Sequence, residues 1–362
     1  MVYLVKLGEV CLVKRGTTIT KKQTLEGNIP VIGGGTKPTY FHNQSNRDSN
    51  CITISGSGAS AGFVNTWDEP IFASDCSTVE PKDETQLNKF IYYFLLSRQK
   101  FIFENFRSGA AQPHVYAKDI ATLDYPIIPI AEQKLIVSKI DAAFSEIDKL
   151  HLLMQSRKIE IESLRSNLLT YFINNQGTGE RTKLKNVVSY IRKNAINSGL
   201  PYVGLENIQS NTMDLIGDIS IPDKTSSTFE FNENYVLYGR LRPYLKKVAV
   251  PEFKGQCSTE IFCLKPNKNL LKKFLAFWLI ESSIAKRIEL SSTGARMPRA
   301  NMNQILDFEI NIPPIDEQIQ IVDKLEKTFK LTKKLNSIHI ALEENLQSLK
   351  SKFLEEELAS LI

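Results

Sequence analysis

Two long segments of the chain carry apolar residues at the spacing typical of helices that pack against a partner helix. From Ile136 to Tyr171 these residues follow one another at alternating intervals of four and three, with one polar position at Arg157. Such a heptad pattern predicts a coiled coil. The second segment, from Ile321, follows the same frame with several polar positions, and we expect its register to stutter near His339. The positions predicted to face a partner helix are Ile140, Ile147, Leu150, Ile161, Leu164 and Leu168 in the first segment, and Leu325, Leu335, Leu342, Leu346, Leu349 and Phe353 in the second.

The two segments belong to a repeated block, because residues 108–169 match residues 293–354 at a constant offset of 185. In both copies a Pro-Ile pair is followed by Glu-Gln, at 129–133 and at 314–318. Proline followed by an acidic residue predicts a helix start. Each helix of about 40 residues would be about 60 Å long at about 1.5 Å per residue, and so long a helix needs a partner. The other copy is the obvious one.

The segment ahead of each helix is predicted to be a globular domain. In the first, the apolar runs 30–32, 51–54, 71–73 and 123–128 predict strands, and 87–103 predicts a helix. The second repeats this plan loosely: 200–203 answers 29–32, 257–259 answers 76–78, and a helix is expected at 270–288, while the offset rises from 177 to 185. We predict a mixed α/β or α+β fold: two similar globular domains separated by two long helices, with pseudo-two-fold symmetry. The predicted boundaries are 1–130, 131–176, 177–315 and 316–362.

Composition places the chain in a reducing compartment. Its 5 cysteines are odd in number and form no Cys-x-x-Cys pair, which favours reduced thiols. The N-terminus lacks the apolar run of a signal peptide, and no run of about eighteen apolar residues occurs. We therefore expect a cytoplasmic protein that does not enter the membrane.

The net charge of +5 lies mainly in the second globular domain. Residues 180–315 carry 19 Lys+Arg against 13 Asp+Glu, whereas residues 1–130 carry 13 against 12. The helical segments are neutral to slightly acidic, with 6 against 6 in 131–179 and 7 against 9 in 316–362. A polyanion such as DNA would therefore contact the globular domains rather than the helices.

The strongest candidate for DNA contact is the stretch 238–247, which combines cations and aromatic rings at Arg240, Arg242, Tyr244 and Lys246. Arginine can bind guanine edges through two hydrogen bonds, and lysine suits phosphates. An ordinary solvated basic strand is the alternative. At the equivalent place, residues 55–63 of the first domain are mostly small and include Ser57; they would let the backbone approach a groove closely, or simply form a flexible loop.

Other polar clusters in both domains could read bases or hold phosphates. Amide side chains could read adenine, and cations could hold phosphates. Taken singly, each of these residues is more often an ordinary surface residue. The candidates are Lys14, Arg15, Lys21, Lys22, Lys37, Tyr40, His42, Asn43 and Gln44 in the first domain, and Arg192, Lys193, Asn194, Asn207, Gln209, Arg296 and Arg299 in the second.

Catalytic patterns are weak, and we predict neither catalytic residues nor a metal site. The glycines at 33–35 are not followed by Gly-Lys-Ser/Thr, so they form no phosphate-binding loop. The histidines and cysteines lack metal-ligand spacing. A Mg²⁺-dependent nuclease using Asp223, Glu252 and Lys254 is the alternative from a different functional class; it predicts cleavage by the purified chain.

The chain resembles the specificity (S) subunit of type I restriction-modification systems. The likeness rests on the repeated motifs at 127–133 and 312–318, together with Ser-Gly-Ala at 108–110 and Thr-Gly-Ala at 293–295. It covers nearly the whole chain. Ala131 departs from the family, which has an acidic residue there.

The resemblance implies that each domain is a target recognition domain reading one half of a bipartite double-stranded DNA site. The helices would form an antiparallel coiled coil that sets the spacer and docks two methyltransferase (M) subunits, through which restriction (R) subunits join. The S subunit would catalyse nothing and bind no cofactor, while the M subunits would use S-adenosylmethionine to methylate adenine. Alternatives are the specificity subunit of a type IIB or solitary methylation system, or a coiled-coil scaffold that does not bind DNA.

Overall fold

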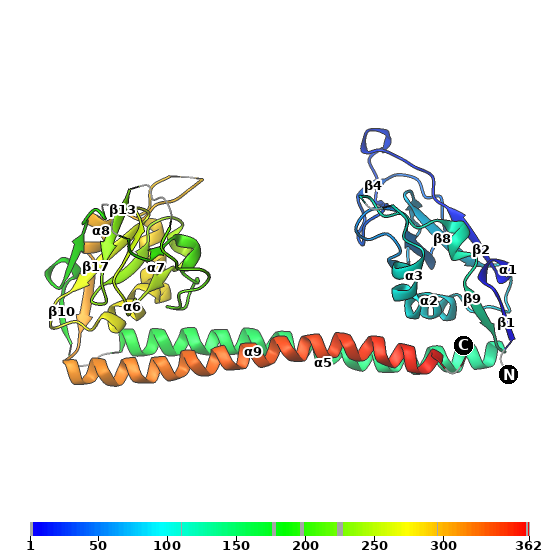
Figure 1. Ribbon diagram of the computed structural model, residues 1–362. Helices are drawn as coiled ribbons and strands as arrows, with labels where there is room; N and C mark the ends of the chain where they lie inside the picture. Colours follow the sequence, from blue (N-terminus) through cyan, green and yellow to red (C-terminus); the bar gives the residue numbers. More distant parts are fainter. Residues whose placement is uncertain are drawn as a thin grey trace. The chain divides into compact units, whose positions relative to one another are not determined.

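The computed structural model describes residues 3–109, 111–175, 179–195, 199–222, 227–294, 296–359 and 361. The chain divides into two compact units. The first contains Met1–Leu153 and Ala341–Ile362, and the second contains Met154–Ile340. Each unit therefore holds one globular domain and part of each of the two long helices (Figure 1).

The first domain is built on a four-stranded antiparallel sheet in the order β2-β8-β5-β6. A smaller sheet, β4-β3-β7, contains one parallel pair, and β1 pairs with β9. The central strand β5 is buried along its length, as its apolar and small residues require. The elements are β1 (Tyr3–Lys6), α1 (Leu7–Val10), β2 (Cys11–Arg15), η1 (Lys21–Gln23), β3 (Ile29–Ile32), β4 (Tyr40–His42), β5 (Cys51–Ser55), β6 (Val64–Trp67), β7 (Phe72–Ala73), β8 (Cys76–Pro81), α2 (Asn88–Ser97), α3 (Gln99–Asn105), α4 (Ala117–Ile120) and β9 (Asp124–Ile127).

The second domain repeats this topology, which confirms the predicted pair of similar mixed domains. Its main sheet has the order β11-β17-β14-β15, and β10 pairs with β18. Its smaller sheet, β12-β16-β13, keeps the parallel pair, which is β12 with β16 here and β3 with β7 in the first domain. The third strand pairs with β16, the second member of that pair, whereas in the first domain it pairs with β3, the first member. The elements are β10 (Glu180–Lys183), η2 (Leu184–Asn186), β11 (Val188–Ile191), β12 (Tyr202–Val203), η3 (Leu205–Asn207), β13 (Thr228–Phe231), β14 (Val236–Gly239), η4 (Pro243–Leu245), β15 (Val248–Ala249), β16 (Gly255–Ser258), β17 (Ile261–Pro266), α6 (Lys272–Ile280), α7 (Ser282–Leu290), α8 (Met302–Leu306) and β18 (Glu309–Ile312).

The topology corrects one predicted correspondence. β8 and β17 occupy the same place in their sheets, so Cys76 corresponds to Ile261. The predicted match of 257–259 with 76–78 is wrong, because Cys257 lies in β16 of the smaller sheet. The two Cys-Ser-Thr segments are alike in sequence but do not occupy equivalent places in the fold.

Each predicted helix of the globular domains is in fact two shorter helices. The first breaks at Arg98, between α2 and α3, and the second at Glu281, between α6 and α7. Glu281 leaves the helical conformation, and its carboxylate accepts hydrogen bonds from the backbone N–H groups of Ser283 and Ile284. It thereby caps α7.

The long helix α5 (Ile130–Asn174) is fixed to the first domain by a glutamine of the repeated motif. Gln133 is fully buried. Its Nε2 donates to the carbonyls of Thr85 (2.9 Å) and Ile128 (3.0 Å), and its Oε1 accepts from the N–H of Leu87 (2.8 Å). The side chain therefore ties the first turn of α5 to the segment that leads into α2.

The long helix α9 (Ile315–Ala359) is fixed to the second domain in the same way. Gln318 is fully buried, and its Nε2 donates to the carbonyls of Asn269 and Pro313, both at 2.8 Å. Its Oε1 accepts from the N–H of Leu271 at 2.8 Å. We call this pair of buried side chains the glutamine latches.

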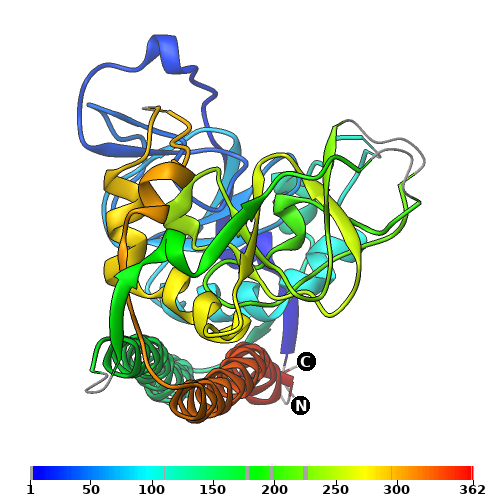
Figure 2. The ribbon, with the colours of Figure 1, turned by 90° about the vertical axis from the view of Figure 1, so that its left-hand side faces the viewer.

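Within each unit the two long helices run antiparallel and contact each other. In the first unit, Lys350 bonds to Asp148 (2.5 Å) and Lys139 to Glu357 (3.4 Å). In the second unit, Asn336 donates to Glu162 at 2.8 Å. Figure 2 looks along the helices beneath the second domain. No helix in the described ranges is long and apolar enough to cross a membrane.

The contact between the helices does not follow the predicted register throughout. Ile140, Ile147 and Leu325 are buried as predicted. Beyond them the prediction holds only in part: the polar frame positions Thr332 and His339 are buried, whereas Asn336 is covered in place of Leu335. The helix continues through His339, and the expected stutter in its register stays a prediction. The predicted positions Leu150, Leu164, Leu335, Leu342 and Leu349 are exposed, whereas Ile161, Leu168, Leu346 and Phe353 are half-buried.

This difference arises because the seam includes polar side chains that a search for apolar residues passes over. Thr332 and His339 are 6% and 7% exposed, whereas Leu342 and Leu349 are 47% and 49% exposed. Buried polar residues in a helix contact can fix its register at a cost in stability. Regular coiled-coil packing of the two helices stays a prediction.

Candidate nucleic-acid interface

Three loops meet at one end of the main sheet in the first domain. They are the loop after β5, the loop before β8 and the hairpin ahead of α4. Gly56 donates to the carbonyl of Asp75 (3.0 Å) and accepts from the N–H of Val115 (3.0 Å), while Gly58 donates to the carbonyl of Pro113 (2.9 Å). We call these loops, residues 55–58, 74–75 and 108–115 without residue 110, the first tip.

The second domain forms the same hydrogen bonds with different residues. Arg240 donates to the carbonyl of Glu260 (2.8 Å) and accepts from the N–H of Ala300 (2.9 Å), and Arg242 donates to the carbonyl of Pro298 (2.8 Å). Residues 239–242, 259–260 and 293–300 without residue 295 are the second tip. Arg240 thus occupies the place of a glycine in the first tip, and so does Arg242.

The backbone conformation supports this equivalence. Gly58 and Gly62 have φ values of 78° and 89°, and the residues at the same places in the second domain, Arg242 and Lys246, have φ values of 51° and 49°. Positive φ suits glycine and strains other residues. The second domain therefore keeps two long basic side chains where the fold favours glycine, and strain of this kind collects at functional sites.

In each tip an acidic residue binds a side chain of a neighbouring loop. In the first tip the hydroxyl of Ser57 donates to the carboxylate of Asp75. In the second, the Nε of Arg299 lies 3.2 Å from both carboxylate oxygens of Glu260. Ser57 and Arg299 were predicted to contact DNA, and in the free chain both are engaged within the tip.

Two glycines at the first tip, Gly34 and Gly56, allow close packing. A Cβ atom on Gly34 would lie 2.5 Å from the carbonyl oxygen of Ser57, and one on Gly56 would lie 3.0 Å from that of Asp75. The turn after β3 therefore presses directly against the first tip. This accounts for a glycine-rich segment that binds no phosphate in the manner of a nucleotide-binding loop.

Tyr40 and His42 were predicted to read DNA, but the structure gives them structural roles. The hydroxyl of Tyr40 donates to the carbonyl of Ile19. His42 is buried, accepts a hydrogen bond from the N–H of Leu25 at its Nδ1 (3.0 Å) and packs edge-on against Phe72. Both side chains point into the domain because β4 must hold the long loop between β2 and β3.

Two predicted phosphate contacts lie beside carboxylates of their own domain. Lys14 lies 3.8 Å from Glu80. Lys193 forms an ion pair with Glu230, whose hydrogen bond raises the pKa of the lysine and holds the pKa of the carboxyl below its usual range. Both lysines remain exposed, and each shares its carboxylate with a second cation, Arg47 at Glu80 and Lys254 at Glu230.

Lys246 is tied to the long helix α5. Its Nζ donates to the hydroxyl of Ser282 (3.0 Å), which lies 3.3 Å from the hydroxyl of Ser166. Burial lowers the pKa of Lys246. The end of the basic loop in the second domain is therefore anchored, and only its middle is free to meet a ligand.

The remaining predicted side chains lie open to solvent. They include a cation at the same place in both domains, since Arg15 ends β2 and Arg192 follows β11; Arg192 lies 4.5 Å from the ring centre of Tyr190. Arg240 is half-buried, 5.9 Å from the ring centre of Phe262. The exposed members of the predicted set are Arg15, Lys37, Asn43, Gln44, Arg192, Arg242, Tyr244 and Arg296.

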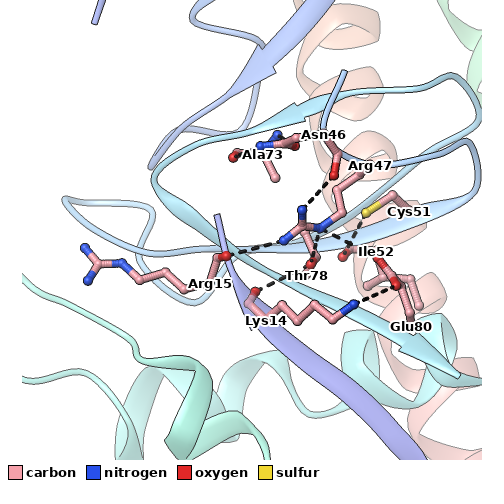
Figure 3. A network of polar contacts seen from close by, with 9 residues as sticks. All are labelled: Lys14, Arg15, Asn46, Arg47, Cys51, Ile52, Ala73, Thr78 and Glu80. Carbon is pink, nitrogen blue, oxygen red and sulfur yellow. Dashed lines mark hydrogen bonds and ion pairs between the residues drawn. The ribbon is translucent and has the colours of Figure 1, made fainter. Parts of the chain in front are cut away.

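Sequence reasoning missed Arg47, which organises the edge of the first domain (Figure 3). Its guanidinium donates to the Thr78 hydroxyl (2.9 Å), the Asn46 carbonyl (2.7 Å) and the Arg15 carbonyl (3.3 Å), and it lies 3.6 Å from Glu80. The Arg15 side chain points away from this network. Arg47 thus holds the backbone of Arg15 while leaving its charge free, and no sequence pattern indicated this.

The buried thiols are poor candidates for chemistry. Burial raises the pKa of Cys11, Cys51 and Cys76 to about 12, so these groups stay protonated at neutral pH. A hydrogen bond with Cys263, together with burial, raises the pKa of Cys257. A thiol rather than a thiolate is a weak nucleophile and a weak metal ligand.

The nuclease alternative rests on Asp223, which lies outside the described residues. Of its other members, Lys254 is 3.3 Å from Glu230, and Glu252 is exposed. Among the residues that the structure describes, no group of three or more His, Cys, Asp or Glu side chains could hold a metal ion.

Comparison with known proteins identifies relatives over most of the chain. An *Escherichia coli* protein described as the type I restriction enzyme EcoDI specificity subunit is 23% identical over 281 residues, which are 67% of this chain and 62% of that relative. The chain thus spans less than two thirds of the relative's length.

Solved structures share the fold. One from work on complex assembly and conformational transition of the type I R-M system has a TM-score of 0.75 at 17% identity, covering 98% of this chain and 97% of the other. The HsdS subunit from *Thermoanaerobacter tengcongensis* has a TM-score of 0.56 at 17% identity, covering 98% and 96%. A family model described as the type I restriction modification DNA specificity domain matches residues 2–163 and 178–344. The chain therefore belongs to the type I restriction-modification DNA specificity family and contains two copies of its domain.

Proposed function

We propose that the chain is the DNA-binding specificity subunit of a type I restriction-modification complex, in which each globular domain reads one half of a bipartite target. One observation carries the proposal. Both tips use the same backbone hydrogen bonds but present different side chains at equivalent places, glycine at Gly56 and Gly58 against Arg240 and Arg242. A shared frame with exchanged side chains suits one task performed on two sequences.

The long helices would set the spacing between the half-sites and bind the methyltransferase subunits. Their exposed leucines support this role, because apolar side chains repeated along a helix mark contact with another protein. Two M subunits would dock there and methylate adenine with S-adenosylmethionine, and restriction subunits would join through them. The chain itself would contribute recognition and no catalysis. The exposed leucines on the two helices are Leu135, Leu150, Leu152, Leu153, Leu164, Leu331, Leu335, Leu342 and Leu349.

Methylation mapping tests this function. The chain and its M partner would be expressed in a host without adenine methylation, and modified bases would be located by sequencing. We expect two short sequences separated by a spacer of fixed length and free composition. M alone serves as the control and should leave the genome unmodified. A single continuous motif would contradict the division of labour between the domains.

A further inference from the structure

A long loop leaves the first domain beside its tip. It comprises residues 16–28, between β2 and β3, and starts directly after the exposed Arg15. Gly16 donates to the carbonyl of Cys76 (2.8 Å), Thr17 to that of Ala73 (2.9 Å), and the N–H of Ile19 to the Ser74 hydroxyl (3.2 Å). The loop is therefore rooted on the segment that carries Asp75.

Both arms of this loop are fixed by β4. The Tyr40 hydroxyl binds the carbonyl of Ile19 on the outgoing arm, and His42 accepts from the N–H of Leu25 on the returning arm. Gly27 packs so closely that a Cβ atom would lie 2.4 Å from the Cα of Asn43. A loop held at both sides presents its end in a defined position at a small entropic cost on binding.

The end of the loop carries two adjacent lysines on a short 3₁₀ turn. Lys21 and Lys22 lie in η1, which is closed by a hydrogen bond from the N–H of Thr20 to the side chain of Gln23 (2.8 Å). Both lysines are exposed, and neither has an ion-pair partner in the part of the chain that the structure describes. The single acidic residue of the loop is Glu26.

The pairing of charges shows where the first domain is positive. Lys6 is bound to Asp124, and Lys14 and Arg47 share Glu80, so each of these cations lies beside a carboxylate. In contrast, Arg15, Lys21, Lys22 and Lys37 are exposed and have no carboxylate partner among the described residues. The lysine pair on the loop therefore carries positive charge that no carboxylate of the described residues offsets.

The second domain lacks this feature. Its connection between β11 and β12 is shorter, and the lysine that it carries, Lys193, forms an ion pair with Glu230. The second tip instead holds free charge within its frame, at Arg242 and Arg296. The lysine pair therefore compensates in the first domain for cations that the first tip does not contain.

We infer that Lys21 and Lys22 bind the DNA phosphate backbone beside the half-site read by the first domain. This inference rests on the proposed function and adds a contact to it. Lysine ammonium groups on flexible stems bind as point charges and lack the planar fork that distinguishes bases. The pair therefore contributes affinity that does not depend on sequence, and its anchors Tyr40 and His42 act as positioning residues.

Salt-dependent binding of the full chain with its M subunits tests the inference. Two labelled duplexes are used: one containing the target found by methylation mapping and one of random sequence. The double variant Lys21→Ala/Lys22→Ala should make the slope of log affinity against log salt shallower by about 1.8, and lower affinity about 10- to 30-fold at physiological salt. The loss should be equal for both duplexes.

Lys100→Ala is the matched control, because Lys100 is also exposed and lies on α3. It should leave the slope unchanged. An unchanged slope in the double variant, or a loss confined to the target duplex, would overturn the assignment of Lys21 and Lys22 while leaving the proposed function intact. If the wild-type complex shows no preference for the mapped duplex, the proposed function itself fails.

Discussion

The two tips show how one frame can carry two different surfaces. At the places with positive φ, the first domain has Gly58 and Gly62, whereas the second has Arg242 and Lys246. The backbone hydrogen bonds are the same in both. The fold therefore does not need these cations, and the second domain keeps them despite a backbone strain of about 1 kcal/mol or more for each. Residues that are kept despite such strain, where the other domain has glycine, are the best markers of recognition.

The structure that the two domains share is disrupted most strongly by mutation of the glutamine latches. Gln133→Ala would leave backbone groups of Thr85, Leu87 and Ile128, which are buried or partly buried, without their side-chain partner, and Gln318→Ala would do the same in the second domain. Each unsatisfied group costs about 1–3 kcal/mol. We expect each variant to lose about 3 kcal/mol or more of the free energy of unfolding, measured by urea denaturation. A large loss in one variant and none in the other would show that the latches are not equivalent.

The difference between the two tips is tested by Arg242→Gly. This variant gives the second domain the residue of the first, so its guanidinium is lost while the backbone strain is relieved. Recognition of one half-site should weaken by about 1–3 kcal/mol, which is roughly 10- to 100-fold. The free energy of unfolding should stay the same or rise by about 0.5–1 kcal/mol.

The readout for Arg242→Gly is binding to duplexes with single changes in either half of the mapped target, together with urea denaturation. Arg287→Gln is a control that removes a cation from α7, outside the tip. Equal weakening on every duplex would mark Arg242 as a phosphate contact. A loss of stability would refute the claim that the side chain opposes the fold.

A smaller effect is expected at the helix breaks. Glu281 is fully buried, and the Thr170 hydroxyl donates to it at 2.8 Å, whereas the residue at the break in the first domain is Arg98. Burial alone would raise the pKa of Glu281, but hydrogen bonds from Ser283 and Thr170 hold it below its ordinary value of 4.5. Because the folded pKa is lowered, this carboxylate stabilises the fold above pH 4.5, and the contribution is lost as the pH falls through the folded value.

Urea denaturation at several pH values checks this expectation. The wild-type chain should lose stability between pH 4.5 and the lower folded pKa more steeply than Glu281→Gln, which cannot titrate. Parallel pH profiles for the two proteins would show that Glu281 contributes no linkage. Asp307→Asn, at an exposed carboxyl held by Lys183 and Lys185, measures how much of the slope comes from surface pairs.

The sequence allowed the frame to be predicted because the frame is repeated. Proline followed by Glu-Gln marked both helix starts, and the structure adds the reason: the glutamine is the latch. The helix seam was predicted less well, since Leu335, Leu342 and Leu349 are exposed and the polar Asn336 is covered in place of Leu335. No local pattern distinguishes a polar residue that faces a partner helix from one that faces water.

Site residues were harder to predict, because the chemistry of a side chain does not show whether it faces solvent or the interior of the domain. Tyr40 and His42 have the side chains of DNA readers, yet they hold a loop whose own lysines are the better candidates. The value of Arg47 depends on Thr78 and Glu80, which are distant in sequence. A residue's role here follows from its partners across the sheet, and one sequence does not reveal those partners.

Insertion of one heptad into both long helices tests the central claim, that two separate domains read two half-sites at a spacing set by the helices. Insertion after Leu153 and after Ile340 leaves the contacts within each unit unchanged. Seven residues add about 10 Å, or about three base pairs at about 3.4 Å each. Methylation mapping should find both half-sequences unaltered and the spacer longer by about that amount. Altered half-sequences, or an unchanged spacer with methylation intact, would contradict this account.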